Sequence, residues 1–162
     1  MSNYVGNKIV FYGEDENVKK ILEEIKSEKQ PIDFNRIIPM PNNIFRGNLG
    51  IEEEQKYGKD NRYDWSIENW GTKWNAYNTC LTEDDEGNTV LFFNTAWKPP
   101  MPIIEKLCEI CHKSNVDLMG IYSNEDFDSD CHGLWDCIDG MFNDYPLYKD
   151  EVNEVYTEIW GV

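Results

Sequence analysis

The order of strand-like and helix-like segments is the feature that most constrains the fold of this chain. Residues 7–12 (NKIVFY) are rich in β-branched and aromatic side chains, whereas residues 15–28 place apolar side chains at helical spacing. Further strand-like runs cover 76–82, 89–95 and 117–123, and a second helix-like run covers 103–114. A Gly-Asn turn between the first two of these strands favours a hairpin. This order predicts an α+β sandwich, with an antiparallel sheet that carries helices on one face.

Size and composition favour one domain spanning residues 1–162. Of these 162 residues, 40% are hydrophobic and 14% aromatic, which is enough to build a packed core. The N-terminal residues do not combine a basic segment with a long apolar run, and no stretch is long and apolar enough to cross a bilayer. We therefore expect a cytoplasmic protein that does not associate with membranes.

The net charge is strongly negative and unevenly distributed. The chain has 31 acidic and 15 basic residues, giving a net charge of −16. From Ser114 to the end there are twelve acidic residues and one basic residue, Lys149, so this acidic C-terminal extension carries −11. Such a surface repels nucleic acid and anionic lipid, which excludes direct nucleic-acid binding as an expected function.

Charge runs are usually solvated surface, but this one permits a sharper hypothesis. The acidic residues could imitate a phosphate backbone and dock on a basic host or defence protein, with interleaved apolar side chains as anchors. The D-x-D-x-D string departs from an EF-hand loop, because it lacks the required Gly and Glu. If extended, it would line its three carboxylates along one face. The candidate partner-binding residues are Glu125, Asp126, Asp128, Asp130, Trp135, Asp136 and Asp139.

Residues 108–112 (CEICH) spell the C-x-x-C-H haem-attachment string. On a helix, Cys108 and Cys111 would continue the buried face formed by Ile104 and Leu107, so both cysteines are interpreted as small core residues. We expect no cofactor, no metal and, without a secretory signal, reduced thiols. A zinc site remains the alternative, since the chain also contains Cys131, His132 and Cys137, although their spacing is irregular.

Two tryptophan-rich strings are the most individual part of the sequence. The first contains Asn69, Trp70, Gly71, Thr72, Lys73 and Trp74, and the second contains Thr95, Ala96, Trp97, Pro99 and Pro100. Together they resemble the YubB-type ferredoxin-like domain family of plasmid and phage proteins. The resemblance implies a single ferredoxin-like domain and a mobile-element context. It implies no catalytic activity, and the name describes the fold rather than an iron–sulfur cluster.

The tryptophan strings permit two interpretations. They could form a structural corner, in which the strand carrying Trp97 packs on a tight turn at Gly71. Alternatively, they could form a polar cluster on an aromatic floor that binds a small anion or a peptide. The ligand-binding residues would then be Asn69, Trp70, Thr72, Lys73, Trp74 and Trp97.

Two function hypotheses follow from these observations. The first is a non-catalytic protein-interaction module of a phage or mobile element, including the case of an acidic nucleic-acid mimic that inhibits a host or defence protein. The second is a small-ligand-binding or enzymatic domain centred on the residues 69–74 and 95–97. The first is favoured here by the uneven charge and by the lack of a recognisable catalytic motif in the sequence.

Overall fold

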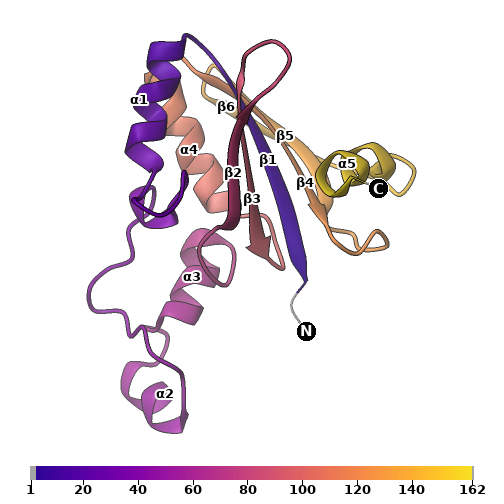
Figure 1. Cartoon of the computed structure of the whole chain (residues 1–162). Coiled ribbons are helices and arrows are strands. Elements are labelled where there is room, and N and C mark those ends of the chain that lie inside the picture. The colour runs from indigo at the N-terminus through magenta and orange to yellow at the C-terminus, as the bar shows by residue number, and fades with distance from the viewer. Residues whose placement is uncertain (1–2, 162) are drawn as a thin grey trace.

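The computed structural model describes residues 3–161 and contains a six-stranded sheet flanked by helices (Figure 1). The strands are β1 (Tyr4–Tyr12), β2 (Tyr77–Glu83), β3 (Thr89–Ala96), β4 (Asp117–Asn124), β5 (His132–Ile138) and β6 (Met141–Pro146). The helices are α1 (Asp15–Ile25), the short 3-10 helix η1 (Phe34–Arg36), α2 (Ile51–Tyr57), α3 (Arg62–Trp70), α4 (Met101–Lys113) and α5 (Val152–Trp160). The strand order is β2-β3-β1-β4-β5-β6, and each neighbouring pair is antiparallel.

The predicted α+β class and its predicted elements are confirmed, and the chain order explains their arrangement. Strand β1 lies between β3 and β4, with Ile9 opposite Leu91 on one side and Gly120 on the other. The chain leaves β1 through α1 and later leaves β3 through α4, so both helices connect strands that are not neighbours in the sheet. The four strands β1–β4 with α1 and α4 form the split β-α-β pattern of ferredoxin-like domains.

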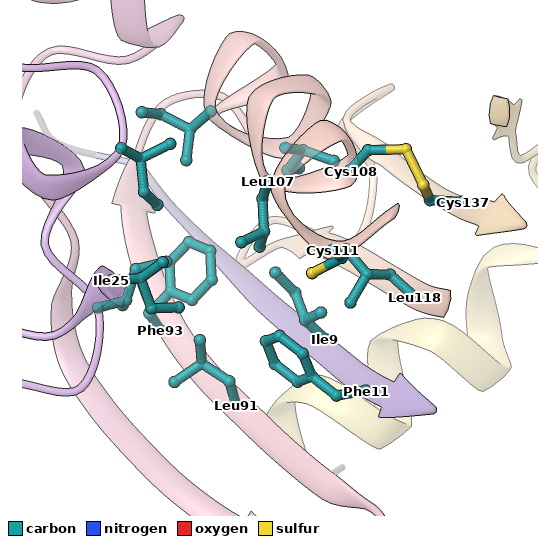
Figure 2. Close-up of a cluster of buried hydrophobic side chains, with 14 of the residues drawn as sticks. Ile9, Phe11, Ile25, Leu91, Phe93, Leu107, Cys108, Cys111, Leu118 and Cys137 are labelled. Atoms are coloured by element: carbon teal, nitrogen blue, oxygen red, sulfur yellow. A yellow bond between two sulfur atoms is a disulfide. The ribbon is translucent and has the colours of Figure 1, made fainter. Parts of the chain in front are cut away.

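The main core lies between one face of the sheet and the helices α1 and α4. Alternate residues of β1, namely Val5, Ile9 and Phe11, are fully buried on this face. Helix α4 contributes Leu107 and Cys111 from its apolar side, as Figure 2 shows. The helical spacing in the sequence therefore identified the buried face of α4 correctly.

Helix α5 packs on the opposite face of the sheet, so the expectation that helices cover one face does not hold for it (Figure 1). Gly6 and Lys8 alternate with the core residues of β1 and point toward α5. A Cβ atom at Gly6 would clash with a methyl group of Ile159, and the Lys8 ammonium pairs with Glu158. Close approach of α5 thus depends on a glycine in β1.

Part of the acidic C-terminal extension forms strands β5 and β6, which extend the sheet beyond β4. The connection from β4 to β5 is not extended, so the condition for a straight D-x-D-x-D strip is not met. Asp126 instead closes a local turn, in which its Oδ1 accepts from the Asp128 N–H and its carbonyl accepts from the Ser129 N–H.

A disulfide joins Cys108 of α4 to Cys137 of β5, with a Cα–Cα distance of 5.8 Å (Figure 2). This corrects the expectation that all five cysteines are reduced thiols. The bridge closes across the core because β5 lies beside β4 under α4, a proximity that the sequence spacing does not reveal. Disulfides persist mainly in oxidising compartments, so the bridge weighs against the expected reducing, cytoplasmic setting.

The remaining cysteines are Cys80, which is exposed, Cys111, which is buried, and Cys131, which is half-buried. Burial raises the pKa of the Cys111 thiol to about 12 and that of Cys131 to about 11. Among residues 3–161, no three His, Cys, Asp or Glu side chains gather in a way that could hold a metal ion. Within the same range, no helix combines the length and apolar character needed to cross a membrane.

Alkylation with iodoacetamide tests this assignment of the cysteines. In folded, unreduced protein at about pH 8, Cys80 should react much faster than Cys111 and Cys131, because a raised pKa leaves little thiolate and burial limits access. After unfolding without reductant three cysteines should be labelled, and after reduction all five. Peptide mass spectrometry identifies the sites. Labelling of Cys137 before reduction would contradict the bridge.

Candidate functional site

Helix α3 and the segment after it form one wall of the candidate site. The helix begins after Asn61, whose Oδ1 accepts from the Asp64 N–H at 2.9 Å, and it ends at Gly71, whose φ is +79°. A Cβ atom at Gly71 would lie 2.7 Å from Pro102 Cδ, so glycine also permits close packing against the start of α4. The sequence interpretation recognised a turn at Gly71 but missed the helix before it.

Three of the predicted ligand-binding residues serve the fold instead. Trp70 is only 3% exposed, and its indole N–H donates to the Ile38 carbonyl at 2.9 Å. The buried Thr72 hydroxyl donates to the Ala96 carbonyl at 2.6 Å, which ties the end of α3 to the end of β3. Asn69 donates to the Trp65 carbonyl within its own helix. The structural interpretation is therefore correct for these residues.

The other three predicted residues come together at the surface around a lysine. The Lys73 ammonium lies 3.8 Å from the ring centroid of Trp97, 5.7 Å from that of Trp74 and 5.4 Å from that of Tyr63. Trp97 is 47% exposed and Trp74 is 45% exposed, so neither is a core residue. Cation–π attraction positions the ammonium among these rings. The Trp97 side chain is therefore not a buried part of the structural corner, although the Thr72–Ala96 hydrogen bond joins the turn to its strand.

The backbone of Trp97 adopts a conformation that is unfavourable for its residue type. Its φ is +72°, in the left-handed region that favours glycine. Hydrogen bonds on both sides hold this conformation: the Trp97 N–H donates to the Asn3 carbonyl at 2.8 Å, and the Thr95 hydroxyl donates to the Lys98 carbonyl at 2.7 Å. Backbone strain that the surrounding structure maintains is frequent at binding sites.

Trp97 lines a cavity of about 680 Å³, here named the Trp97 cavity. It is lined by α3 and the segment after it, the β3–α4 connection, the start of α4, the β4–β5 connection and single residues of β4 and β6. Its lining combines cations with carboxylates and aromatic rings, namely Lys73, Lys98, Asp130, Asp144, Trp97 and Tyr122. Burial raises the pKa of both the Asp144 carboxyl and the Tyr122 phenol, so these groups are partly withdrawn from water.

A second cavity of about 550 Å³, here named the Arg62 cavity, lies on the other side of Lys73. Both cavities are lined by Tyr63 and Lys73, which therefore form the ridge between them. The second cavity is also lined by Arg46 and Arg62, which the sequence interpretation did not identify. No carboxylate is among its lining residues.

The predicted acidic surface is divided by the fold. Glu125, Asp126, Asp128 and Asp130 are all exposed in the β4–β5 connection, and Asp130 also lines the Trp97 cavity. Asp136 lies on the opposite face of β5 from Trp135, and Asp139 is in the β5–β6 turn.

The proposed role of Trp135 as an exposed anchor is wrong. Its side chain is only 2% exposed, and it occupies the space above Gly120, where an added Cβ would clash with the indole ring. The alternation of β5 explains this burial, because Trp135 and Cys137 share the face that is covered by α4.

Comparison with known proteins assigns the fold of the segment that carries most of this geometry. Residues 69–135 match a ferredoxin-like domain. The matching family model is described as a ferredoxin-like domain in Api92-like protein. This confirms the ferredoxin-like fold expected from the tryptophan strings, while the YubB-type assignment and the phage or plasmid context stay predictions.

A search of curated proteins finds no match. The crystal structure of a protein Api92 from Yersinia pseudotuberculosis is similar with 15% sequence identity and a TM-score of 0.41. That similarity covers 54% of this chain but only 31% of the Api92 chain.

Substitution of the two tryptophans should separate their roles. Trp70→Ala should lower the free energy of unfolding by about 3–5 kcal/mol, because it empties a buried aromatic site. Trp97→Ala should cost much less, since about half of the side chain is already in water. Trp97→Gly should be more stable than Trp97→Ala by about 1 kcal/mol, because glycine tolerates the positive φ. Urea denaturation measures all three, and equal losses at both positions would refute this division.

Proposed function

We propose that this chain is a non-catalytic binding module that holds a small ligand or a peptide segment in the Trp97 cavity. One observation carries the proposal: the Lys73 ammonium lies 3.8 Å from the ring centroid of a half-exposed tryptophan that lines a cavity and whose backbone is held in a strained conformation. A fold that needed only a corner at this point would gain nothing from the strain. The strained backbone conformation is explained if Trp97 must present its ring to a ligand.

The size and lining of the Trp97 cavity agree with this proposal. Its volume of about 680 Å³ falls in the usual range of small-molecule sites, which extends from roughly 300 to 1,000 Å³. Aromatic and aliphatic side chains provide most of the contact surface, and a few charged groups can fix orientation. Lys73 and Lys98 can bind anionic or carbonyl oxygens, and Asp130 and Asp144 can accept hydrogen bonds. A peptide supplies both carbonyl oxygens for the lysines and N–H donors for the carboxylates.

The arrangement favours binding over catalysis. Cys131 lines the cavity, but burial raises the pKa of its thiol to about 11, which opposes formation of the nucleophilic thiolate. The adjacent His132 cannot serve as its base, because its ring points to the opposite face of the sheet. There its Nδ1 lies 2.7 Å from Ser123 Oγ, and its ring packs near Tyr156 of α5.

A second candidate function is electrostatic docking of a basic partner on the acidic loop of residues 125–130. Within residues 3–161, the ion pairs are Lys8–Glu158, Lys26–Glu23 and Lys106–Glu109, and all of them are formed by residues outside this loop. The loop carboxylates therefore act together on an approaching cation. We propose a basic host or defence protein as that partner, with a phage or mobile element as the setting.

Binding in the Trp97 cavity can be tested with a library of short peptides. We expect hits to shift the indole N–H signal of Trp97 in nitrogen-15 NMR spectra and to bind more weakly to Lys73→Gln and Trp97→Ala. Lys149→Gln is the matched control, because it also removes one positive charge but lies outside the cavity. Hits that leave the Trp97 signal unchanged and bind Lys73→Gln normally would exclude this cavity as the site.

Docking on the acidic loop predicts a salt-dependent association rate. Association with a basic partner should slow as ionic strength rises and the Debye length falls below about 10 Å. It should also slow in the double variant Asp126→Asn, Asp128→Asn. This variant keeps the turn, because an amide oxygen at position 126 can still accept the hydrogen bond from the N–H of residue 128. The control variant Glu52→Gln with Glu54→Gln removes the same charge from α2. Surface plasmon resonance measures the rates, and equal effects of the two variants would exclude the loop as the docking site.

A further inference from the structure

The Arg62 cavity concentrates positive charge in a strongly acidic chain. The chain has a net charge of −16 and only three arginines, two of which line this one cavity together with Lys73. None of these three cations forms an ion pair within residues 3–161. Unneutralised cations that gather in a hollow, rather than spreading over the surface, indicate a site for negative charge.

From this arrangement we infer that the Arg62 cavity is an oxyanion subsite, which binds the carboxylate or phosphate group of a ligand that carries an aromatic ring. The inference rests on the proposed function in one respect: Lys73 lines both cavities, so a ligand in the Arg62 cavity shares a residue with one in the Trp97 cavity. It adds the chemical class of ligand and two binding residues, Arg46 and Arg62.

Arg46 is held in place before any ligand arrives. Its Nη1 donates to the Ile44 carbonyl at 3.0 Å, and its Nη2 donates to the Met40 and Pro41 carbonyls at 3.2 Å and 3.1 Å. The guanidinium still has further N–H donors, including that on Nε, for an oxyanion. Because its side chain is already ordered, binding costs less conformational entropy than it would at a free arginine.

Arg62 approaches the same cavity from a second element. It is the first residue of α3, and its side chain is exposed. Two guanidinium groups from separate segments, on a lining that also includes Lys73, suit an anion that has several oxygens. The carboxylate of Asp33 does not line the cavity; it accepts from Asn75 Nδ2 at 2.8 Å and from the Asn35 N–H at 2.9 Å.

Three aromatic side chains also contribute to the cavity wall. Tyr63, Trp70 and Trp74 all contribute to the lining. Tyr63 and Trp74 also flank Lys73, at 5.4 and 5.7 Å from its ammonium, so flat rings and cations lie side by side. A flat ring bearing an oxyanion can contact both kinds of group at once.

Nitrogen-15 NMR of the arginine side chains gives a direct test. Three arginines produce three Nε–H signals, and Arg36 is an internal control, since its Nε donates to the Glu24 carbonyl and it does not line the cavity. The probes are phenyl phosphate and benzoate, which separate phosphate from carboxylate, and the neutral benzyl alcohol. At least one of the two anions should shift the signals of Arg46 and Arg62 and leave that of Arg36 unchanged.

Variants then test the contribution of charge. Arg62→Gln should weaken binding of the preferred anion by about tenfold, since it removes a charged hydrogen-bond donor. Arg36→Gln removes the same charge elsewhere and should have little effect. Arg62→Lys should recover part of the affinity, which separates lost charge from a folding defect, and circular dichroism checks the fold of each variant.

The proposal is overturned if benzyl alcohol binds as well as the anions, if all three arginine signals shift together, or if Arg36→Gln and Arg62→Gln weaken binding equally. Its failure is distinguishable from that of the proposed function. Peptides that shift the Trp97 indole signal while both anions leave Arg46 and Arg62 unchanged would refute the oxyanion subsite alone. Anion binding at Arg62 without any peptide effect at Trp97 would refute the Trp97 cavity alone.

Discussion

Burial of strand β1 on both faces is the constraint on which the rest of the structure depends. Its odd-numbered residues Val5, Ile9 and Phe11 face α1 and α4, while Gly6 and Lys8 face α5. Because β1 also pairs with β3 and β4 at its two edges, its central residues have neighbours on both faces and at both edges. The end of β3 pairs with β1 and accepts a hydrogen bond from Thr72 after α3. These contacts determine the position of Trp97 relative to α3.

Local periodicity was sufficient to predict the elements whose partners are close in sequence or whose apolar side is regular. Strands β1 to β4 and helices α1 and α4 all carry such a pattern. Strands β5 and β6 were missed because acidic residues lie within and between them, so Trp135 and Cys137 were interpreted as parts of a charged surface. Helix α3 was missed because Trp70 was interpreted as part of a turn, although it is the last residue of the helix.

The site was predictable in part, for a similar physical reason. An unusual density of tryptophan around a lysine pointed to Lys73, Trp74 and Trp97, which the fold brings together. Sequence alone does not show which polar side chains form hydrogen bonds with the backbone, as those of Asn69 and Thr72 do. Arg46 and Arg62 lie in separate segments and belong to no motif. The available signal was the scarcity of arginine in this chain, since two of its three copies meet in one place.

The position of Lys73 on the ridge between two cavities has a thermodynamic consequence. Its ammonium can occupy only one position at a time, and its present contact with Trp97 competes with any anion that draws it toward Arg62. If occupation of one cavity moves this group, the affinity of the other must change, and linkage requires the effect to be equal in both directions. One flexible side chain could then make two adjoining sites communicate without any movement of the backbone.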